Sequence, residues 1–381
     1  MKIQVERDVL ADAVAWAARS LPTRPPVPVL AGLLLEATAD GTLAFAGFDY
    51  EVSARVEVPA DVAEPGRALV SGRLLADISR SLPARPVDLV LDGQKVVVSC
   101  GAARFTLLTL PVEEYPALPA MPAAAGSVAG AVFSAAVAQV TVAAGRDDTL
   151  PVLTGVRVEI DDTEITLYAT DRYRLATRRL QWTPERPGTS AVVLVPARTL
   201  ADAAKALGSA EVTLALSDGG SRSGSTGEGM VGFEGRGRRM TARLLDGEFP
   251  KVRALFPPSA ETVASVELAP FVEAVKRVAL VAERNTPVRL AFSDGQVTLQ
   301  AGAGDEAQAS ESLEADLDGV DITIAFNPAY LLDGLAALGT PYVQMSFTTP
   351  AKPAVLAGRR EADGEADGDY RYLLMPVRLS G

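Results

Sequence analysis

Histidine is absent from this 381-residue chain, and cysteine occurs once, at Cys100. Without histidine, a Ser-His-Asp triad, a Cys-His dyad and every histidine-containing zinc site are excluded. A single cysteine excludes an internal disulfide and a thiolate cluster, and it fits a reducing compartment. Nothing in the spacing of the acidic residues selects a carboxylate pair for acid–base catalysis. The sequence therefore argues against an enzyme, and we expect neither a metal nor a cofactor.

The chain has 36 basic and 48 acidic residues, which gives a formal net charge of −12 at pH 7. Taken as a sum, this charge argues against nucleic-acid binding, which depends on concentrated positive charge. The sum hides how the charge is distributed along the chain. With 48% apolar and 22% charged residues the composition is globular, and the length suggests two or three domains.

One uncharged stretch, residues 115–145, is long enough in principle to span a bilayer. Alanine, glycine and proline dominate it, with Pro116, Pro119 and Pro122 near its start, so a linker followed by a buried helix is favoured. Residues 1–7 alternate like a strand and lack the apolar segment of a signal peptide. We therefore expect a cytoplasmic protein that does not associate with membranes.

The chain repeats itself three times. An amphipathic helical pattern occurs at residues 10–14, 133–137 and 271–275. Each copy is followed by an arginine, a short polar stretch and a Pro-Val pair that we expect to open a strand. The arginines are Arg24, Arg146 and Arg284, and the Pro-Val pairs begin at Pro28, Pro151 and Pro287.

A second helical pattern also recurs, at residues 69–77, 194–202 and, more weakly, 325–333. The first two copies end alike, in Glu114-Tyr115-Pro116 and Glu248-Phe249-Pro250. These independent landmarks agree on a period close to one third of the chain, which chance does not explain.

Between the helical patterns, alternating apolar residues flank Asp-Gly pairs at residues 40–41, 92–93 and 294–295. Asp-Gly between alternating runs is a strong hairpin signal, so the intervening structure is predicted to be antiparallel sheet. The predicted fold class is α+β, with three repeated domains of two helices plus antiparallel sheet each. We expect these domains to cover residues 1–120, 127–256 and 259–381.

Three features are imperfect signals of chemistry. Residues 227–232 match G-x-G-x-x-G, but a Ser/Gly-rich loop precedes them and a strand pattern follows, so a hairpin loop is favoured over a dinucleotide site. The acidic run at residues 361–369 lacks the last carboxylate of a calcium loop, so a solvated surface loop is favoured. Asp171 is compatible with catalysis, but a turn aspartate that caps nearby amides is favoured.

Charge is distributed unevenly over the repeat. The helical segments 7–24, 73–85, 133–146, 198–207, 271–284 and 329–338 together carry +5, so the rest of the chain carries −17. A solvated amphipathic face predicts helices that are close to neutral. The alternative is that the helices share one surface that faces a polyanion while the sheets face outward.

Four segments give the repeat a specific resemblance. They read RFTLLTLP with EYP at residues 104–116, ATDRYRLA at 169–176, GEFP at 247–250 and MPVRL at 375–379. In order and spacing they resemble the bacterial sliding clamps, the β subunits of DNA polymerase III, and the similarity covers essentially the whole chain. The resemblance implies that the three domains are clamp domains I, II and III.

The resemblance further implies a head-to-tail homodimer that closes a ring around duplex DNA, with helices lining the hole. Such a protein slides on DNA without reading its sequence and acts as the processivity factor of the replicative polymerase, without a catalytic site of its own. Its implied partners are duplex DNA, the DNA polymerase III α subunit, the clamp loader, and other polymerases and repair proteins that share a short clamp-binding peptide. The residues that we place facing DNA, by their position in the repeat, are Arg24, Arg73, Arg146 and Arg198.

The family also carries a pocket for the partner peptide on the third domain beside the second. By motif match its walls here are Leu153, Thr170, Arg172, Tyr173, Arg174, Leu175, Pro250, Ala254, Leu255, Leu373, Met375, Pro376, Val377 and Arg378. Apolar walls with a methionine suit several related peptides, although Leu153, Leu175 and Leu373 are equally compatible with ordinary core. Two residues depart from the family pattern, because Arg172 stands where many relatives have glycine and Ala254 where some have arginine.

The ring interface implied by the resemblance pairs Leu74, Phe105 and Leu107 of one chain with Leu280 and Val281 of its neighbour. Three alternatives stay open. The chain could be a specialised second clamp with an altered pocket that evades an inhibitor. It could also be a repeat-built scaffold that does not act on DNA, or an enzyme.

Overall fold

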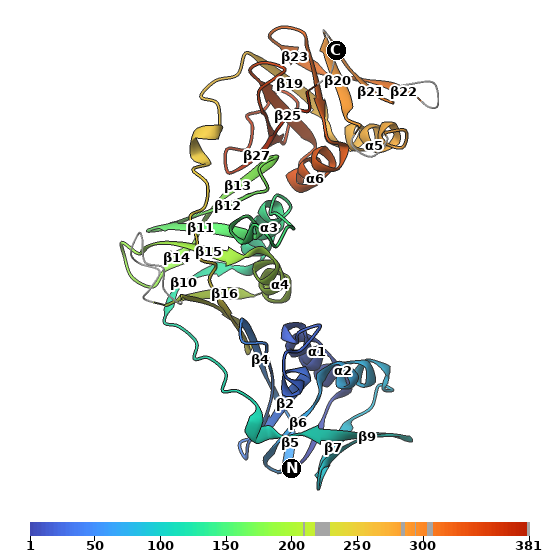
Figure 1. Cartoon of the computed structure of the whole chain (residues 1–381), viewed down its shortest axis with the longest axis vertical. Helices are drawn as coiled ribbons and strands as arrows, with labels where there is room; N and C mark the ends of the chain where they lie inside the picture. Colours follow the sequence, from blue (N-terminus) through green and yellow to red (C-terminus); the bar gives the residue numbers. More distant parts are fainter. Residues whose placement is uncertain (209, 218–228, 283–285, 294, 303–307, 379–381) are drawn as a thin grey trace. The chain divides into compact units, whose positions relative to one another are not determined.

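Figure 1 shows the computed structural model of the chain, which describes residues 1–208, 210–217, 229–282, 286–293, 295–302 and 308–378. Two compact units form. The first contains Met1–Ala131, Thr183–Pro187 and Asp202–Leu244, and the second contains Val132–Trp182, Gly188–Ala201 and Leu245–Gly381. The middle third of the chain is therefore divided between the two units.

The helices confirm the predicted repeat, with two in each third of the described chain, although residues 69–71, 194–196 and 325–326 of the second pattern belong to strands. They are α1 (Arg7–Ala17), α2 (Gly72–Ser81), α3 (Gly130–Thr141), α4 (Ala197–Leu207), α5 (Leu268–Ala279) and α6 (Pro328–Leu338). In α1 the buried residues Leu10, Ala13, Val14 and Ala17 recur at helical spacing and form one apolar face. Helices α1 and α2 lie side by side in the first unit, and α5 and α6 do so in the second (Figure 1).

The first unit is built on one antiparallel sheet. In spatial order its strands are β14 (Thr183–Pro184), β10 (Ala124–Ala129), β16 (Glu211–Leu216), β17 (Met230–Gly235), β18 (Arg238–Arg243), β4 (Val52–Pro59), β3 (Thr42–Phe48), β2 (Gly32–Ala37), β6 (Gly66–Ser71), β9 (Ala103–Leu110), β8 (Lys95–Cys100), β7 (Val87–Asp92), β1 (Lys2–Val5) and β5 (Asp61–Glu64). The pairing of β4 with β18 joins the first third of the chain to the middle third.

The second unit has two sheets. The larger has the order β15 (Ser190–Pro196), β11 (Gly155–Asp161), β12 (Glu164–Thr170), β13 (Arg174–Gln181), β27 (Tyr370–Leu374), β26 (Ala354–Arg359), β25 (Tyr342–Phe347), β19 (Thr262–Glu267) and β23 (Asp316–Asp318). The smaller has the order β22 (Ala309–Glu314), β21 (Gln296–Ala301), β20 (Val288–Ser293) and β24 (Ile322–Phe326). The pairing of β13 with β27 joins the middle third to the last third.

The predicted hairpins are present. Strands β2 and β3 pair around Gly41, β7 and β8 around Gly93, and β20 and β21 around Gly295. All three glycines have positive φ, between 56° and 86°, which glycine adopts without a steric cost. Asp294 of the third pair lies outside the described residues.

The expectation that Pro-Val opens a strand is wrong for the first two repeats. Pro28–Ala31 and Pro151–Thr154 form short 3-10 helices, and the strands begin after them at Gly32 and Gly155. Proline fixes φ near −65° and has no N–H to donate, which suits the first position of a helical turn as well as a strand start. In the third repeat β20 does begin at Val288.

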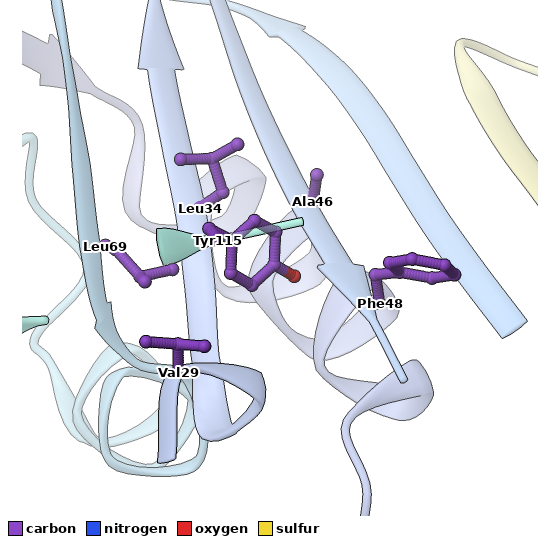
Figure 2. Close-up of a cluster of buried hydrophobic side chains, with 6 residues drawn as sticks. All are labelled: Val29, Leu34, Ala46, Phe48, Leu69 and Tyr115. Atoms are coloured by element: carbon purple, nitrogen blue, oxygen red, sulfur yellow. The ribbon is translucent and has the colours of Figure 1, made fainter. Parts of the chain in front are cut away.

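A buried apolar cluster holds the first repeat to the segment that follows it. Figure 2 shows Tyr115 surrounded by Val29, Leu34, Ala46, Phe48 and Leu69. The Tyr115 side chain is buried, and its hydroxyl, which lies near the Phe48 backbone, has no hydrogen-bond partner of normal geometry among the described residues. Burial raises the pKa of Tyr115 to about 12. The ring therefore contributes apolar packing, while its hydroxyl opposes folding.

Replacing Tyr115 with phenylalanine is expected to raise the free energy of unfolding by about 1 kcal/mol at pH 7, because an unpaired buried hydroxyl costs about 1–3 kcal/mol. Phe249 stands at the matching position of the second repeat, so the ring fits such a site without its hydroxyl. Because the unfolded chain loses the Tyr115 proton first, the stability of the unaltered protein falls as pH rises from 10 to 12. The variant lacks this loss. Urea unfolding at pH 7 and pH 11 measures both effects, and equal stabilities at pH 7 would contradict the expectation.

Candidate functional site

The turn between β12 and β13 organises the candidate partner surface. Asp171 Oδ1 accepts hydrogen bonds from the backbone N–H groups of Tyr173 at 3.0 Å and Arg174 at 3.1 Å. The prediction that Asp171 is a turn aspartate is confirmed. Between these residues Arg172 has a φ of 79°, in the left-handed region that favours glycine. The turn directs the side chains of Arg172 and Tyr173 outward, and both are exposed.

Arg174 ties this turn to helix α6. Its side chain is 4% exposed, with Nε donating to Asp171 Oδ2 at 2.9 Å and Nη1 donating to Asp333 Oδ2 at 2.5 Å. The guanidinium also lies 4.4 Å from the centre of the Tyr330 ring. Burial alone would lower the pKa of Arg174, but the hydrogen bonds to Asp333 and Tyr372 outweigh it and raise that pKa. Arg174 therefore links the turn to α6 through buried interactions, and its side chain is not accessible to a docked peptide.

Four apolar side chains are exposed on this turn and on the segments that pair or pack with its strands, and we call them the apolar surface. They are Tyr173, Leu255, Met375 and Val377, each between 37% and 55% exposed. The backbone N–H of Met375 donates to the carbonyl oxygen of Tyr173 at 2.9 Å, which fixes two of them side by side. Exposed apolar side chains on neighbouring segments make this surface a candidate for contact with another molecule.

A buried cluster lies beneath the apolar surface. Leu175 on β13 faces Leu373 on β27 across the sheet, and both pack with Phe249 and Val252 from the segment that carries Leu255. Of the remaining predicted wall residues, Leu153 and Thr170 are buried, Pro376 is half-buried, and Pro250, Ala254, Arg172 and Arg378 are exposed. For Leu153, Leu175 and Leu373 the core alternative is therefore the one that the structure favours.

Tyr330 is a half-buried residue beside the apolar surface that the sequence did not predict. Its ring stacks on that of Tyr173, with centroids 6.1 Å apart and planes at 24°. It lies in the first turn of α6, where the Asn327 side chain caps the helix by accepting from two backbone N–H groups. The available signal was an aromatic residue in the weakest copy of the second helical pattern.

The first unit supplies an internal comparison, because the same backbone arrangement occurs between β3 and β4. Asp49 Oδ1 accepts from the N–H groups of Glu51 and Val52, Tyr50 has a φ of 76°, and the N–H of Arg243 donates to the Glu51 carbonyl at 2.9 Å. Glu51 and Arg243 thus occupy the positions of Tyr173 and Met375. Their side chains form an ion pair at 3.9 Å. The same backbone arrangement therefore carries apolar side chains at the β12–β13 turn of the second unit and a charged pair at the β3–β4 turn of the first unit.

The residues predicted to face DNA all have exposed side chains. Arg73 Nη2 donates to the carbonyl oxygen of Pro22 at 3.1 Å, which brings Arg73 close to the segment that carries Arg24. Arg198 lies in the first turn of α4, and Arg146 follows α3. No ion pair formed within the described part of the chain includes any of the four arginines.

The predicted interface residues divide into exposed and buried ones. Leu74 and Phe105 are exposed in the first unit, and Leu280 is 84% exposed at the end of α5 beside half-buried Val281. Leu107 differs from the expectation, because it is 2% exposed and pairs with buried Val96 on the core side of β9.

The neighbour of Leu107, Leu108, is 72% exposed and was missed. Side chains alternate along a strand, so one position decides whether a leucine is core or surface. Leu107 can therefore pack beneath Phe105 within the core, but its own side chain is not available to a neighbouring chain.

The G-x-G-x-x-G match and the acidic run are described only in part or through their ion pairs. Residues 227 and 228 of the G-x-G-x-x-G match lie outside the described residues, and β17 begins at Met230, as the strand pattern predicts. In the acidic run, Asp367 pairs with Arg178 and Asp369 pairs with Arg179, each at 3.2 Å.

Two further features are absent from the described residues. Among them, His, Cys, Asp and Glu form no cluster suited to a metal ion. No helix in the same residues is long and apolar enough to cross a membrane.

Comparison with known proteins gives three consecutive family matches. The chain matches the DNA polymerase III beta subunit N-terminal domain over residues 1–119, its central domain over 127–251 and its C-terminal domain over 253–378. It is 64% identical to the beta sliding clamp of Streptomyces coelicolor over 382 residues, and 48% identical to the beta sliding clamp homolog GriR of Streptomyces muensis over 380 residues. Both alignments cover 100% of each chain.

Solved structures agree with these matches. A sliding clamp of Pseudomonas aeruginosa bound to griselimycin superimposes with a TM-score of 0.89 at 27% identity, covering 100% of both chains. The repeated α+β domains therefore define a DNA polymerase sliding clamp. The chain belongs to the DNA polymerase III beta subunit family.

Proposed function

We propose that two copies of this chain form a head-to-tail ring that encircles duplex DNA and tethers the replicative polymerase for processive synthesis. The observation that carries the proposal is the succession of three sliding-clamp domains in one chain, at 64% identity to a beta sliding clamp over its whole length. The domain boundaries that we propose are those expected from the repeat, 1–120, 127–256 and 259–381. The protein acts in the cytoplasm, at the nucleoid during replication, without catalysing a reaction and without a cofactor.

Open sheet edges support the ring. Residues 103–108 of β9 pair with β8 on one side only, because β6 reaches just Thr109 and Leu110. In the second unit β22 is an edge strand that, among the described strands, pairs with β21 alone. An open edge is a template for pairing with another chain, and a head-to-tail contact needs two different edges. Arg104 on β9 and Glu314 on β22 offer complementary charges.

The DNA contacts that we propose come from Arg24, Arg73, Arg146 and Arg198. Exposed arginines without internal ion-pair partners bind phosphate through charge, which gives affinity without base readout. A ring that slides needs this kind of contact, because base-specific bonds would hold it at one place. The acidic remainder of the chain repels DNA from other surfaces.

The apolar surface is the proposed docking site for the clamp-binding peptide of the polymerase α subunit, the clamp loader, other polymerases and repair proteins. Its support is the contrast with the first unit, where an ion pair between Glu51 and Arg243 occupies the matching positions. The Pseudomonas aeruginosa clamp with bound griselimycin indicates that related clamps accept a ligand. The chain is 48% identical to the clamp homolog GriR but 64% identical to a beta sliding clamp. The role of a replicative clamp is therefore better supported than that of a specialised copy.

A retention experiment tests the proposed function. After loading onto a nicked circular DNA, the protein is expected to co-elute with the DNA in gel filtration and to be lost when one cut linearises the circle, because topology alone holds it. Replacing all four DNA-facing arginines with alanine is expected to shorten the retention time on circular DNA about tenfold at low salt. The effect should diminish as salt rises, since counterion release drives phosphate binding.

Two results would contradict the proposal. Equal retention on circular and linear DNA would exclude a topological link. A scaffold that does not act on DNA would not be retained on either form. A matched control replaces four arginines that lie on strands and pair with carboxylates, and it should leave retention unchanged. They are Arg157, Arg178, Arg179 and Arg239.

A further inference from the structure

Arg172 combines a strained backbone with an exposed side chain that forms no ion pair or ring contact among the described residues. Its φ of 79° lies where a Cβ is disfavoured, and glycine would fit better. Tyr50, at the same position of the first repeat, also has positive φ, but its ring packs edge-on against Phe48 with centroids 5.5 Å apart. Arg172 makes no such ring contact within the described residues. A side chain kept at a strained position, with a minor electrostatic effect on Asp147 as its described interaction, points to an external role.

The surroundings of Arg172 indicate what it could bind. Its exposed side chain precedes Tyr173 of the apolar surface, and it forms no ion pair with the part of the chain that is described. One carboxylate that interacts with its charge is Asp147, whose pKa is lowered mainly by hydrogen bonds from Thr149 and to a smaller extent by the charge of Arg172. When a ligand covers an arginine beside an apolar surface, water no longer screens the guanidinium, so its attraction to a negative charge on the ligand becomes stronger.

We propose that Arg172 is a specificity-determining residue that binds a carboxylate of the partner peptide while the apolar surface takes the peptide's apolar side chains. This proposal rests on the proposed function of the apolar surface. The carboxylate could be an aspartate or glutamate side chain or the free C-terminus of the partner. A guanidinium binds either of them through two parallel N–H donors.

A carboxylate fits Arg172 better than the phosphates of DNA. The exposed Asp147 and Asp148 lie on the neighbouring loop, and the charge of Asp147 is felt at Arg172. A phosphate backbone, which carries many charges, would meet both aspartates, whereas a single carboxylate can be oriented away from them. The ring stack of Tyr173 on Tyr330 directly beside Arg172 also provides the apolar contact that a peptide needs.

The test is an aspartate scan of a fluorescein-labelled peptide from the clamp-binding segment of the polymerase α subunit. Each position in turn carries Asp or Asn, and each peptide is made with a free or an amidated C-terminus. With the unaltered protein, one Asp peptide or the free C-terminus is expected to bind about tenfold more tightly than its neutral form. Arg172→Gly and Arg172→Ala should abolish this preference, and Arg172→Lys should retain part of it.

A second readout separates recognition from folding. Arg172→Gly is expected to raise Tm, because glycine relieves the strained φ, while Arg172→Ala should leave Tm nearly unchanged. A preference for the carboxylate that survives in Arg172→Gly would overturn the proposal. So would an unchanged preference combined with shorter retention on circular DNA, which would assign Arg172 to phosphate.

Met375→Asp keeps the two proposals distinguishable. If Met375→Asp abolishes binding of every peptide but Arg172→Gly keeps the preference, the apolar surface stands and the Arg172 proposal fails. If Met375→Asp binds all peptides like the unaltered protein, the docking surface itself is wrong.

Discussion

Replacing Met375 with aspartate is expected to weaken binding of the α-subunit peptide about 100-fold. Met375 is one of four exposed apolar side chains that a docked peptide would cover. A carboxylate at its position would lose water on docking without gaining a partner, which costs about 3 kcal/mol and corresponds to a hundredfold change in Kd. Fluorescence anisotropy with a labelled peptide measures the change.

The repeat supplies the control for this substitution. Arg243 occupies the matching backbone position beside the β3–β4 turn of the first unit. Its N–H donates to the Glu51 carbonyl oxygen, just as the N–H of Met375 donates to the Tyr173 carbonyl oxygen. Arg243→Asp is therefore expected to leave peptide affinity unchanged. A peptide that binds equally well after Met375→Asp, in a protein with unaltered circular dichroism, would exclude this docking surface.

Local signals in the sequence predicted local structure well. The Asp-Gly pairs gave hairpins because two residues with the right backbone preference decide the turn, and Asp171 capped its turn because its carboxylate reaches amides two and three residues ahead. The helical patterns fell within α1, α3 and α5 because apolar spacing of 3.6 residues has few other solutions.

Features that depend on distant partners were not predictable from the sequence alone. The joining of β4 to β18 pairs residues more than 180 positions apart, and no local pattern encodes it. Arg174 has the sequence character of an exposed arginine, yet Asp171 and Asp333 compensate its burial from two different elements. Such compensation depends on the fold, so it cannot be predicted from the residue type.

The candidate surface shows the same division. Leu255 and Met375 were assigned by motif, and their exposure is what a docking surface requires. Tyr330 was missed because its role arises from a ring stack across two elements. On β9, Leu107 is buried and the next residue, Leu108, is exposed. Motif matching could therefore identify the strand at the interface, but not which of its side chains a neighbouring chain would contact.

Placing aspartate at both Leu280 and Val281 is expected to convert the dimer to a monomer. Leu280 is an apolar side chain with 84% of its surface exposed in the single chain, at the end of α5. In the proposed ring it would be buried against the neighbour's β9, where an unpaired carboxylate is strongly disfavoured. The dimer dissociation constant should increase at least about 100-fold.

Sedimentation velocity checks this expectation, because the unaltered protein should sediment at twice the chain mass of 39.8 kDa and the variant at 39.8 kDa. Val320 provides a matched control, since it is an exposed apolar residue of the same unit outside the proposed interface, and Val320→Asp should remain dimeric. A double variant that stays dimeric at micromolar concentration would place the ring contact elsewhere. A monomeric variant should also lose retention on circular DNA while it still binds the peptide, because the apolar surface lies within one compact unit of a single chain and the topological link requires two chains.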